Sequence, residues 1–84
     1  MYEVYLERTA EKDLKKLVQK DFERIVAHLQ QLKETPRPHG CKKIQGSKND
    51  WRVRVGDLRI VYEIDDKRHS IRVMRVRNRS EAYR

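Results

Sequence analysis

The chain has 84 residues and a net charge of +8, and 37% of its residues are hydrophobic and 40% charged. A chain of this length forms one domain with a small stability margin, and its regularly spaced apolar residues argue against disorder. No apolar stretch approaches the roughly 18 residues that a membrane-spanning helix needs. We therefore expect a single folded domain over residues 1–84 that does not cross a membrane.

The first part of the chain predicts a strand and two helices. Residues 1–7 alternate between apolar and polar side chains, which is the pattern of a half-buried strand. Apolar residues then recur at helical spacing in two segments, and we expect Thr9 to cap the first helix. The helices would meet at Lys20–Asp21 as a hairpin, with Asp21 capping the second helix, and Pro36 would end it.

From residue 41 onward the pattern predicts strands. The expected strands are Cys41–Gln45, Trp51–Val55, Leu58–Ile64 and Ser70–Val76. Gly56-Asp57 separates the middle two, and a glycine first in a two-residue loop favours a type II′ hairpin. The order β-α-α-β-β-β-β predicts an α+β fold, in which a two-helix hairpin packs on one face of a mainly antiparallel sheet.

The two-residue turn predicts which residues face each other in the middle hairpin. One side is apolar and is expected to lie beneath the helices, with the pairs Trp51–Tyr62, Val53–Ile60 and Val55–Leu58. The other side places Arg54 opposite Arg59, with Arg52 close by. Like charges directly opposite each other are destabilising, so their presence on an open face indicates a site for an anion. Solvated arginines whose charges are screened by salt are the alternative interpretation.

The positive charge is concentrated in the second part of the chain. Residues 1–36 hold seven Lys or Arg and seven Asp or Glu, whereas residues 37–84 hold 14 and six, respectively. Such a split favours one surface that binds a polyanion. Arg75 and Arg77 share one side of the last strand, and Tyr83 follows. Arginine presents a planar fork of donors that matches phosphate, and a tyrosine can stack on a base or handle a proton.

Two segments then resemble a known family. Trp51–Tyr62 (WRVRVGDLRIVY) and Arg77–Tyr83 (RNRSEAY) strongly resemble the RelE family of toxin–antitoxin mRNA interferases. Ala10–Leu17 and Lys42–Gly46 also fit, so the resemblance covers nearly the whole chain. The arginine hairpin is shared with the related ParE branch, whereas the Arg-x-Arg-Ser-Glu-x-Tyr ending favours the branch that cuts RNA.

The resemblance implies a toxin that enters the ribosomal A site and cleaves mRNA there without a metal or other cofactor. The ribose 2′-hydroxyl would attack the adjacent phosphate, while Arg59 and Arg77 stabilise the charged transition state and Arg77 is also a candidate proton donor. The catalytic set implied in this way is Arg52, Arg54, Arg59, Arg77 and Tyr83. We expect the RNA-binding residues to include Lys42, Lys43, Lys48, Arg75 and Arg79. The expected partners are a RelB-like antitoxin, the ribosome and mRNA.

One departure from the family concerns the general base. The best-studied members carry lysines where this chain has Arg52 and Arg54, and arginine stays protonated in proteins. These two residues are therefore expected to stabilise charge. Tyr83 is the first candidate for the base and Glu63 a weaker one, and catalysis by positioning and electrostatics alone is the third option.

Two other functions remain open from the sequence. One is a ParE-like toxin that inhibits DNA gyrase, and the other is an RNA-binding module without activity. The chain has a single cysteine, Cys41, which excludes an internal disulfide, and it shows no secretory signal pattern. We therefore expect a cytoplasmic protein.

Overall fold

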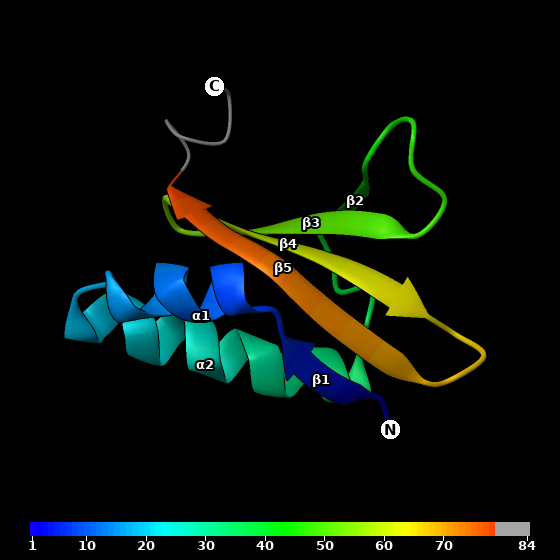
Figure 1. Cartoon of the computed structure of the whole chain (residues 1–84), viewed down its shortest axis with the longest axis horizontal. Coiled ribbons are helices and arrows are strands. Elements are labelled where there is room, and N and C mark those ends of the chain that lie inside the picture. Colours follow the sequence, from blue (N-terminus) through cyan, green and yellow to red (C-terminus); the bar gives the residue numbers. More distant parts are fainter. Residues whose placement is uncertain (79–84) are drawn as a thin grey trace.

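Two helices cover one face of a five-stranded sheet in the computed structural model, which describes residues 1–78 (Figure 1). The elements are β1 (Glu3–Leu6), α1 (Arg8–Lys15), α2 (Gln19–Glu34), β2 (Lys42–Lys43), β3 (Asp50–Val55), β4 (Leu58–Asp65) and β5 (Ser70–Asn78). The strand order is β1-β5-β4-β3-β2, with β1 parallel to β5 and the other pairs antiparallel. The predicted fold class is confirmed. Neither described helix is long and apolar enough to cross a membrane.

The β3–β4 hairpin has the predicted register. Trp51 pairs with Tyr62, and Arg54 pairs with Arg59. Gly56 has a φ of +61°, while Asp57 keeps a negative φ, which is the combination that a type II′ turn requires. Because the side chains of a strand alternate between the two faces, this turn sends the apolar residues to the helices and the arginines to the opposite face, here called the open face.

Strand β1 pairs only with the first part of β5, and helix α1 lies beside the part of β5 that follows. The pairing between β4 and β5 shifts register at Val61 and Tyr62, next to Met74. Thr9 donates a hydrogen bond to the carbonyl of Met74 (2.8 Å), and Asp13 accepts one from the backbone N–H of Val76 (2.9 Å). These side chains satisfy the β5 backbone groups that would otherwise lack a neighbouring strand.

The predicted caps and the junction of the helices are wrong by a few residues. Thr9 lies inside α1, whose N-cap is Glu7. Helix α2 begins at Gln19 with Val18 at its N-cap, so Asp21 lies in its first turn. Acidic residues are favourable at a cap and also in the first turn, where they interact with the helix dipole, so the sequence alone does not distinguish the two positions. The predicted end of α2 before Pro36 is confirmed.

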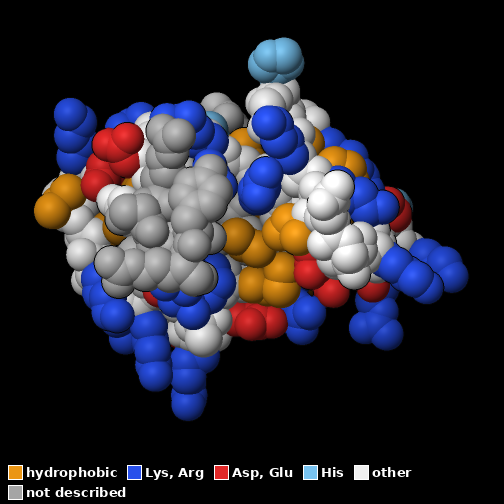
Figure 2. Space-filling model, turned by 90° about the horizontal axis from the view of Figure 1, so that it is seen from above, with side chains coloured by type: hydrophobic (Ala, Val, Ile, Leu, Met, Phe, Trp, Pro, Cys, Tyr) orange, Lys and Arg blue, Asp and Glu red, His pale blue; other side chains and the backbone are white. Residues whose placement is uncertain are grey.

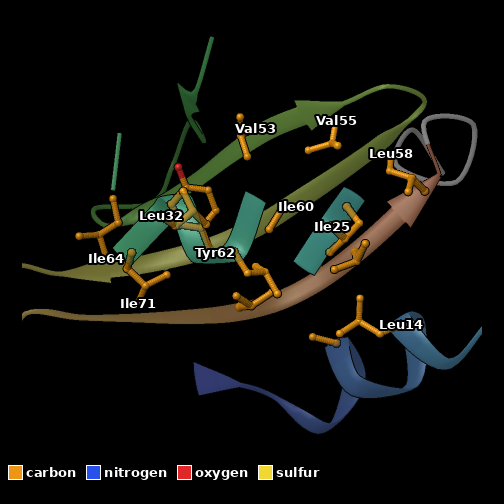
Figure 3. Packing of buried hydrophobic residues seen from close by; sticks show 14 residues of the cluster. Leu14, Ile25, Leu32, Val53, Val55, Leu58, Ile60, Tyr62, Ile64 and Ile71 are labelled. Atoms are coloured by element: carbon orange, nitrogen blue, oxygen red, sulfur yellow. The ribbon is translucent and has the colours of Figure 1, made fainter. Parts of the chain in front are cut away.

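The core lies between α2 and the central strands (Figure 3). Ile25 and Leu32 of α2 pack with the side chains of Ile60, Tyr62 and their neighbours on β4. The side chain of Tyr62 is fully buried, its hydroxyl donates to a carbonyl at 2.9 Å in the loop after α2, and burial raises the pKa of this phenol. The helices thus cover the apolar face of the central strands, and neither described helix lies over the open face (Figure 1).

Trp51 lies at the margin of this core. Its side chain is half-buried, and the Arg37 guanidinium lies over the indole ring, 4.9 Å from the centroid. Arg37 also forms an ion pair with Asp66 at 2.9 Å, and the Tyr2 hydroxyl donates to the same carboxylate at 2.6 Å. These contacts join the loop after α2 to the β4–β5 turn and to the beginning of the chain.

Candidate functional site

The register of three adjacent strands places three arginines in one row across the open face. Arg59 on β4 pairs with Arg54 on β3 and with Arg77 on β5. Neighbouring strands lie about 4.8 Å apart, so the guanidinium groups of this first cationic row can reach a common anion.

A second cationic row lies beside the first, two residues away along each of β3, β4 and β5. It consists of Lys42, Arg52, Val61 and Arg75, which are paired in this order across β2, β3, β4 and β5. At the rise of a strand, two residues correspond to about 7 Å. Figure 2 looks down onto this side of the molecule and shows that Lys and Arg side chains predominate there over Asp and Glu.

A hollow of about 150 Å³ lies between the two rows on the β2 side of the sheet. It is lined by Gly40, Lys42, Arg52, Arg54 and Arg59. The structure therefore brings together four of the predicted site residues. Gly40 was not predicted, and it has a φ of +90°. The only signal in the sequence was its position between Pro38-His39 and the two lysines of β2.

The arginines of the first row differ in exposure. Arg54 is exposed, as is Arg52 in the second row, whereas Arg59 and Arg77 are half-buried. The Arg54 Nε donates to the carbonyl of Gly56 at 3.0 Å, which holds the side chain against the turn. Partial burial reduces solvent screening, so we expect Arg59 and Arg77 to act more strongly on a bound anion than the exposed arginines do.

Arg75 makes an internal ion pair. Its Nε and one terminal nitrogen donate to the two carboxylate oxygens of Asp13 at 2.9 and 3.1 Å. Asp13 is 9% exposed, the one charged residue that is buried within residues 1–78. Sequence analysis missed Asp13, and the only available signal was an acid next to the apolar positions of α1. The contact ties Arg75 to α1.

The other predicted site residues lie apart from the hollow. Lys43 pairs with Trp51 and therefore points to the opposite side of the sheet from Lys42. Lys48 is exposed in the connection between β2 and β3. Arg79 and Tyr83 lie outside the described residues.

Glu63, the weaker candidate for the base, lies in an ion-pair network. Arg72 contacts the Glu63 carboxylate at 3.3 Å and that of Glu7 at 3.2 Å. A second hollow of about 410 Å³ lies at this end of the open face, lined by Tyr5, Glu63, Asp65, Arg68, Ser70 and Arg72. Glu63 lies four residues along β4 from Arg59, or about 13 Å, so this ion-pair network stands apart from the first cationic row.

The chemistry that this arrangement offers is the stabilisation of negative charge. Arginine remains protonated at physiological pH and presents donors that fit phosphate oxygens in pairs. Two rows spaced by about 7 Å can hold an extended anion with more than one charged group. The cationic rows can therefore bind an anion and stabilise added negative charge, and they offer no proton acceptor.

Comparisons with known proteins agree with this geometry. A family described as "ParE toxin of type II toxin-antitoxin system, parDE" matches residues 4–83. No curated protein sequence matches the chain.

Many solved structures have the same fold, among them toxins of the RelE family. The toxin–antitoxin complex RelBE2 from Mycobacterium tuberculosis contains a chain that is 28% identical, with a TM-score of 0.83, over 93% of this chain and 98% of that chain. The isolated E. coli RelE toxin gives 25% identity, a TM-score of 0.81, and coverage of 99% and 92%. The RelE–RelB complex of Pyrococcus horikoshii contains a chain that is 24% identical, with a TM-score of 0.84, over 93% of this chain and 94% of that chain.

Proposed function

Since the chain belongs to the ParE toxin family of type II toxin–antitoxin systems, within the RelE/ParE superfamily, we propose that it is an endoribonuclease that cleaves mRNA in the ribosomal A site. The observation that carries this proposal is the first cationic row, in which Arg54, Arg59 and Arg77 face one another across three strands. Like charges in register on neighbouring strands repel one another, and a phosphate placed between these three arginines would be attracted by all of them.

In the proposed reaction, the ribose 2′-hydroxyl oxygen attacks the adjacent phosphorus. A bond forms between them, the bond from phosphorus to the 5′-oxygen breaks, and a 2′,3′-cyclic phosphate remains on the upstream fragment. The pentacoordinate transition state carries more negative charge than the substrate, and Arg59 and Arg77 are proposed to stabilise that added charge. Arg52 and Arg54 are proposed to hold the flanking phosphates, and Arg77 is the candidate donor of the proton to the leaving 5′-oxygen.

The proton of the 2′-hydroxyl needs an acceptor. Glu63 lies about 13 Å along β4 from Arg59 and is paired with Arg72, which leaves Tyr83 as our first proposal. A tyrosine has an ordinary pKa near 10, so it acts as a base at neutral pH only if the surrounding arginines stabilise the phenolate. Stacking of the Tyr83 ring on a base, with catalysis by positioning alone, is the competing role.

The proposed partners are an antitoxin, the ribosome and mRNA. RelE relatives have been solved as complexes with RelB, which supports a cognate antitoxin for this chain. Such an antitoxin could act in two ways. It could cover the cationic rows with acidic groups at the same spacing, or its size could keep the toxin from entering the ribosome. We propose that the complex forms in the cytoplasm, where ribosomes and mRNA are available.

The test is in vitro translation of a defined mRNA with and without the purified chain, followed by toeprinting. Cleavage within A-site codons, which disappears when ribosomes are omitted, is the expected result. Intact mRNA with normal translation would overturn the proposal. The family description favours one alternative, a ParE-like toxin that acts on DNA gyrase, so supercoiling by purified gyrase is measured in parallel. Inhibition of gyrase with intact mRNA would select that alternative.

A further inference from the structure

The open face changes its charge along the strands. Beyond the two cationic rows, the register gives a third row, in which Asp50, Glu63 and Arg72 are paired across β3, β4 and β5, with Tyr5 next on β1. A fourth row contains Asp65, Ser70 and Glu3. The first row carries three basic residues, and the second carries three of which Arg75 is paired with Asp13 of α1. The third row holds two acids and one base, and the fourth holds two acids and no base.

The acids of the third and fourth rows, here called the acidic rows, are accessible to solvent. The side chains of Glu63 and Asp65 are 35% and 41% exposed, and Glu3 is exposed. Arg72 divides its charge between Glu63 and Glu7, and Arg68 approaches Asp65 only to 3.9 Å. The four acids of these rows thus outnumber Arg72 and Arg68, the bases that pair with them, and the rows carry a net negative charge.

From this charge reversal we infer that the acidic rows form a boundary that excludes the RNA backbone and limits the footprint of the chain to the two cationic rows. This inference rests on the proposed function and adds the residues that determine how much RNA is bound. Glu63 lies four residues along β4 from Arg59, or about 13 Å, which exceeds the screening length of ~8 Å at physiological salt. Its charge therefore acts on a phosphate placed beside it and little on one bound at Arg59. A phosphate placed one further step beyond the cationic rows would meet Glu63 and Asp50 and would be repelled.

The consequence is selectivity for a short segment. A long single strand usually gains affinity with each phosphate that it places on a basic groove. Here the gain stops after two rows, because the next phosphates lie over carboxylates. A long free RNA is then bound weakly, because its outer phosphates meet the acidic rows. A short stretch of RNA that the ribosome holds over the cationic rows is bound without this repulsion. The acidic rows would thus favour RNA presented by the ribosome over free RNA.

The experiment measures binding rather than cleavage. Single-stranded RNA with 2′-O-methyl groups is used, because it lacks the attacking hydroxyl and stays intact. The double variant Glu63→Gln/Asp65→Asn removes two charges of the boundary and keeps the side-chain sizes, and the Asn Oδ1 can still accept the backbone N–H of Arg68. The matched control is Glu23→Gln/Glu34→Gln, which makes the same change of net charge on α2.

The expected result is a rise of about fivefold or more in the affinity of the boundary variant for a dodecanucleotide at physiological salt. The slope of log affinity against log salt should steepen by ~0.7 for each added phosphate contact. For the unmodified chain, affinity should rise little from the hexanucleotide to the dodecanucleotide, whereas the boundary variant should continue to gain. The α2 control should stay within about twofold of the unmodified chain.

Equal gains for the boundary variant and the α2 control would overturn the inference, because net charge alone would explain them. No gain in the boundary variant would overturn it as well. Arg54→Ala separates this failure from that of the proposed function. If Arg54→Ala weakens binding while the boundary variant is unchanged, the cationic rows bind RNA and only the boundary is wrong. If Arg54→Ala leaves binding unchanged, the proposed RNA site itself is wrong.

Discussion

Arg54 and Arg59 face each other directly across the β3–β4 ladder, both on the face that the helices leave open. This pairing leads to the first prediction. Replacement of Arg59 by alanine should lower A-site cleavage by about 10²-fold or more, which is the usual effect of removing one transition-state donor. The fold should remain, because one like-charge neighbour is removed from the sheet. Single-turnover cleavage on programmed ribosomes and thermal unfolding measure the two effects, and cleavage at the unmodified rate would remove Arg59 from the mechanism.

Tyr83 gives the second prediction, which separates proton transfer from stacking. Tyr83→Phe keeps the ring and removes the hydroxyl, while Tyr83→Ala removes both. If the phenol transfers a proton, the Phe variant should lose about 10²-fold or more in cleavage. If the ring stacks, Phe should be close to the unmodified chain and only Ala should be impaired, by roughly 1–3 kcal/mol. Ribosome binding is measured alongside, and normal cleavage by both variants would show that Tyr83 takes no part.

The Asp13–Arg75 pair predicts a loss of stability that differs from that of a surface pair. Asp13→Ala should lower the free energy of unfolding by roughly 3 kcal/mol, because Arg75 and the Val76 N–H lose their acceptor. Arg68→Met removes an exposed pair with Asp65 at 3.9 Å and should change stability by less than ~0.5 kcal/mol. Urea unfolding checks both values. Arg75→Met should lower stability and leave RNA affinity nearly unchanged, so a large loss of RNA affinity in a stable variant would instead assign Arg75 to the binding surface.

The paired aromatic residues Tyr62 and Trp51 should differ in how much stability their replacement removes. Tyr62 is fully buried, so Tyr62→Ala should destabilise by roughly 3–5 kcal/mol, and Tyr62→Phe by about 1 kcal/mol through the lost hydrogen bond. Trp51 is half-buried, so Trp51→Ala should cost roughly 2 kcal/mol. Equilibrium denaturation orders the three variants. A greater loss for Trp51→Ala than for Tyr62→Ala would contradict the described packing.

The contacts of Asp66 predict a dependence of stability on pH. Its hydrogen bond with Arg37, followed by the one from Tyr2, lowers the pKa of this carboxyl below its ordinary value of 3.8. A lowered pKa in the folded state contributes stability that is complete above the ordinary value and is lost as the pH falls through the lowered one. Asp66→Asn should therefore be less stable than the unmodified chain at pH 6, and the difference should shrink below pH 4. A difference that stays constant down to pH 2 would show that Asp66 does not titrate in this way.

The sequence was sufficient for those parts of the fold that local patterns determine. The two-residue turn at Gly56 fixes the register of β3 and β4, and the register in turn fixes the arginine faces, so Arg52, Arg54 and Arg59 are confirmed as neighbours. The helix boundaries were less predictable, because Glu7 and Val18 stand at the N-caps without making a side-chain capping bond.

Contacts between distant parts of the chain were not predictable in this way. Asp13 and Arg75 are 62 residues apart, and neither the helical nor the strand pattern contains information about the other. The register shift beside Met74 also depends on the meeting of α1 with β5, so the parity of the last strand alone could not show that Arg75 contacts α1. Such contacts are visible only once the elements are assembled.

The parallel pairing of β1 with β5 bears on when the first cationic row can form during synthesis. Glu3 pairs with Ser70 and Leu6 with Val73, so the first strand to be synthesised has its place in the sheet only beside the last. β5 also lies between β1 and β4, and it carries Arg77. Such distant pairing is slow to form, and it cannot begin before the final strand emerges. A nascent chain therefore lacks the complete first cationic row until β5 has emerged and has paired with β4.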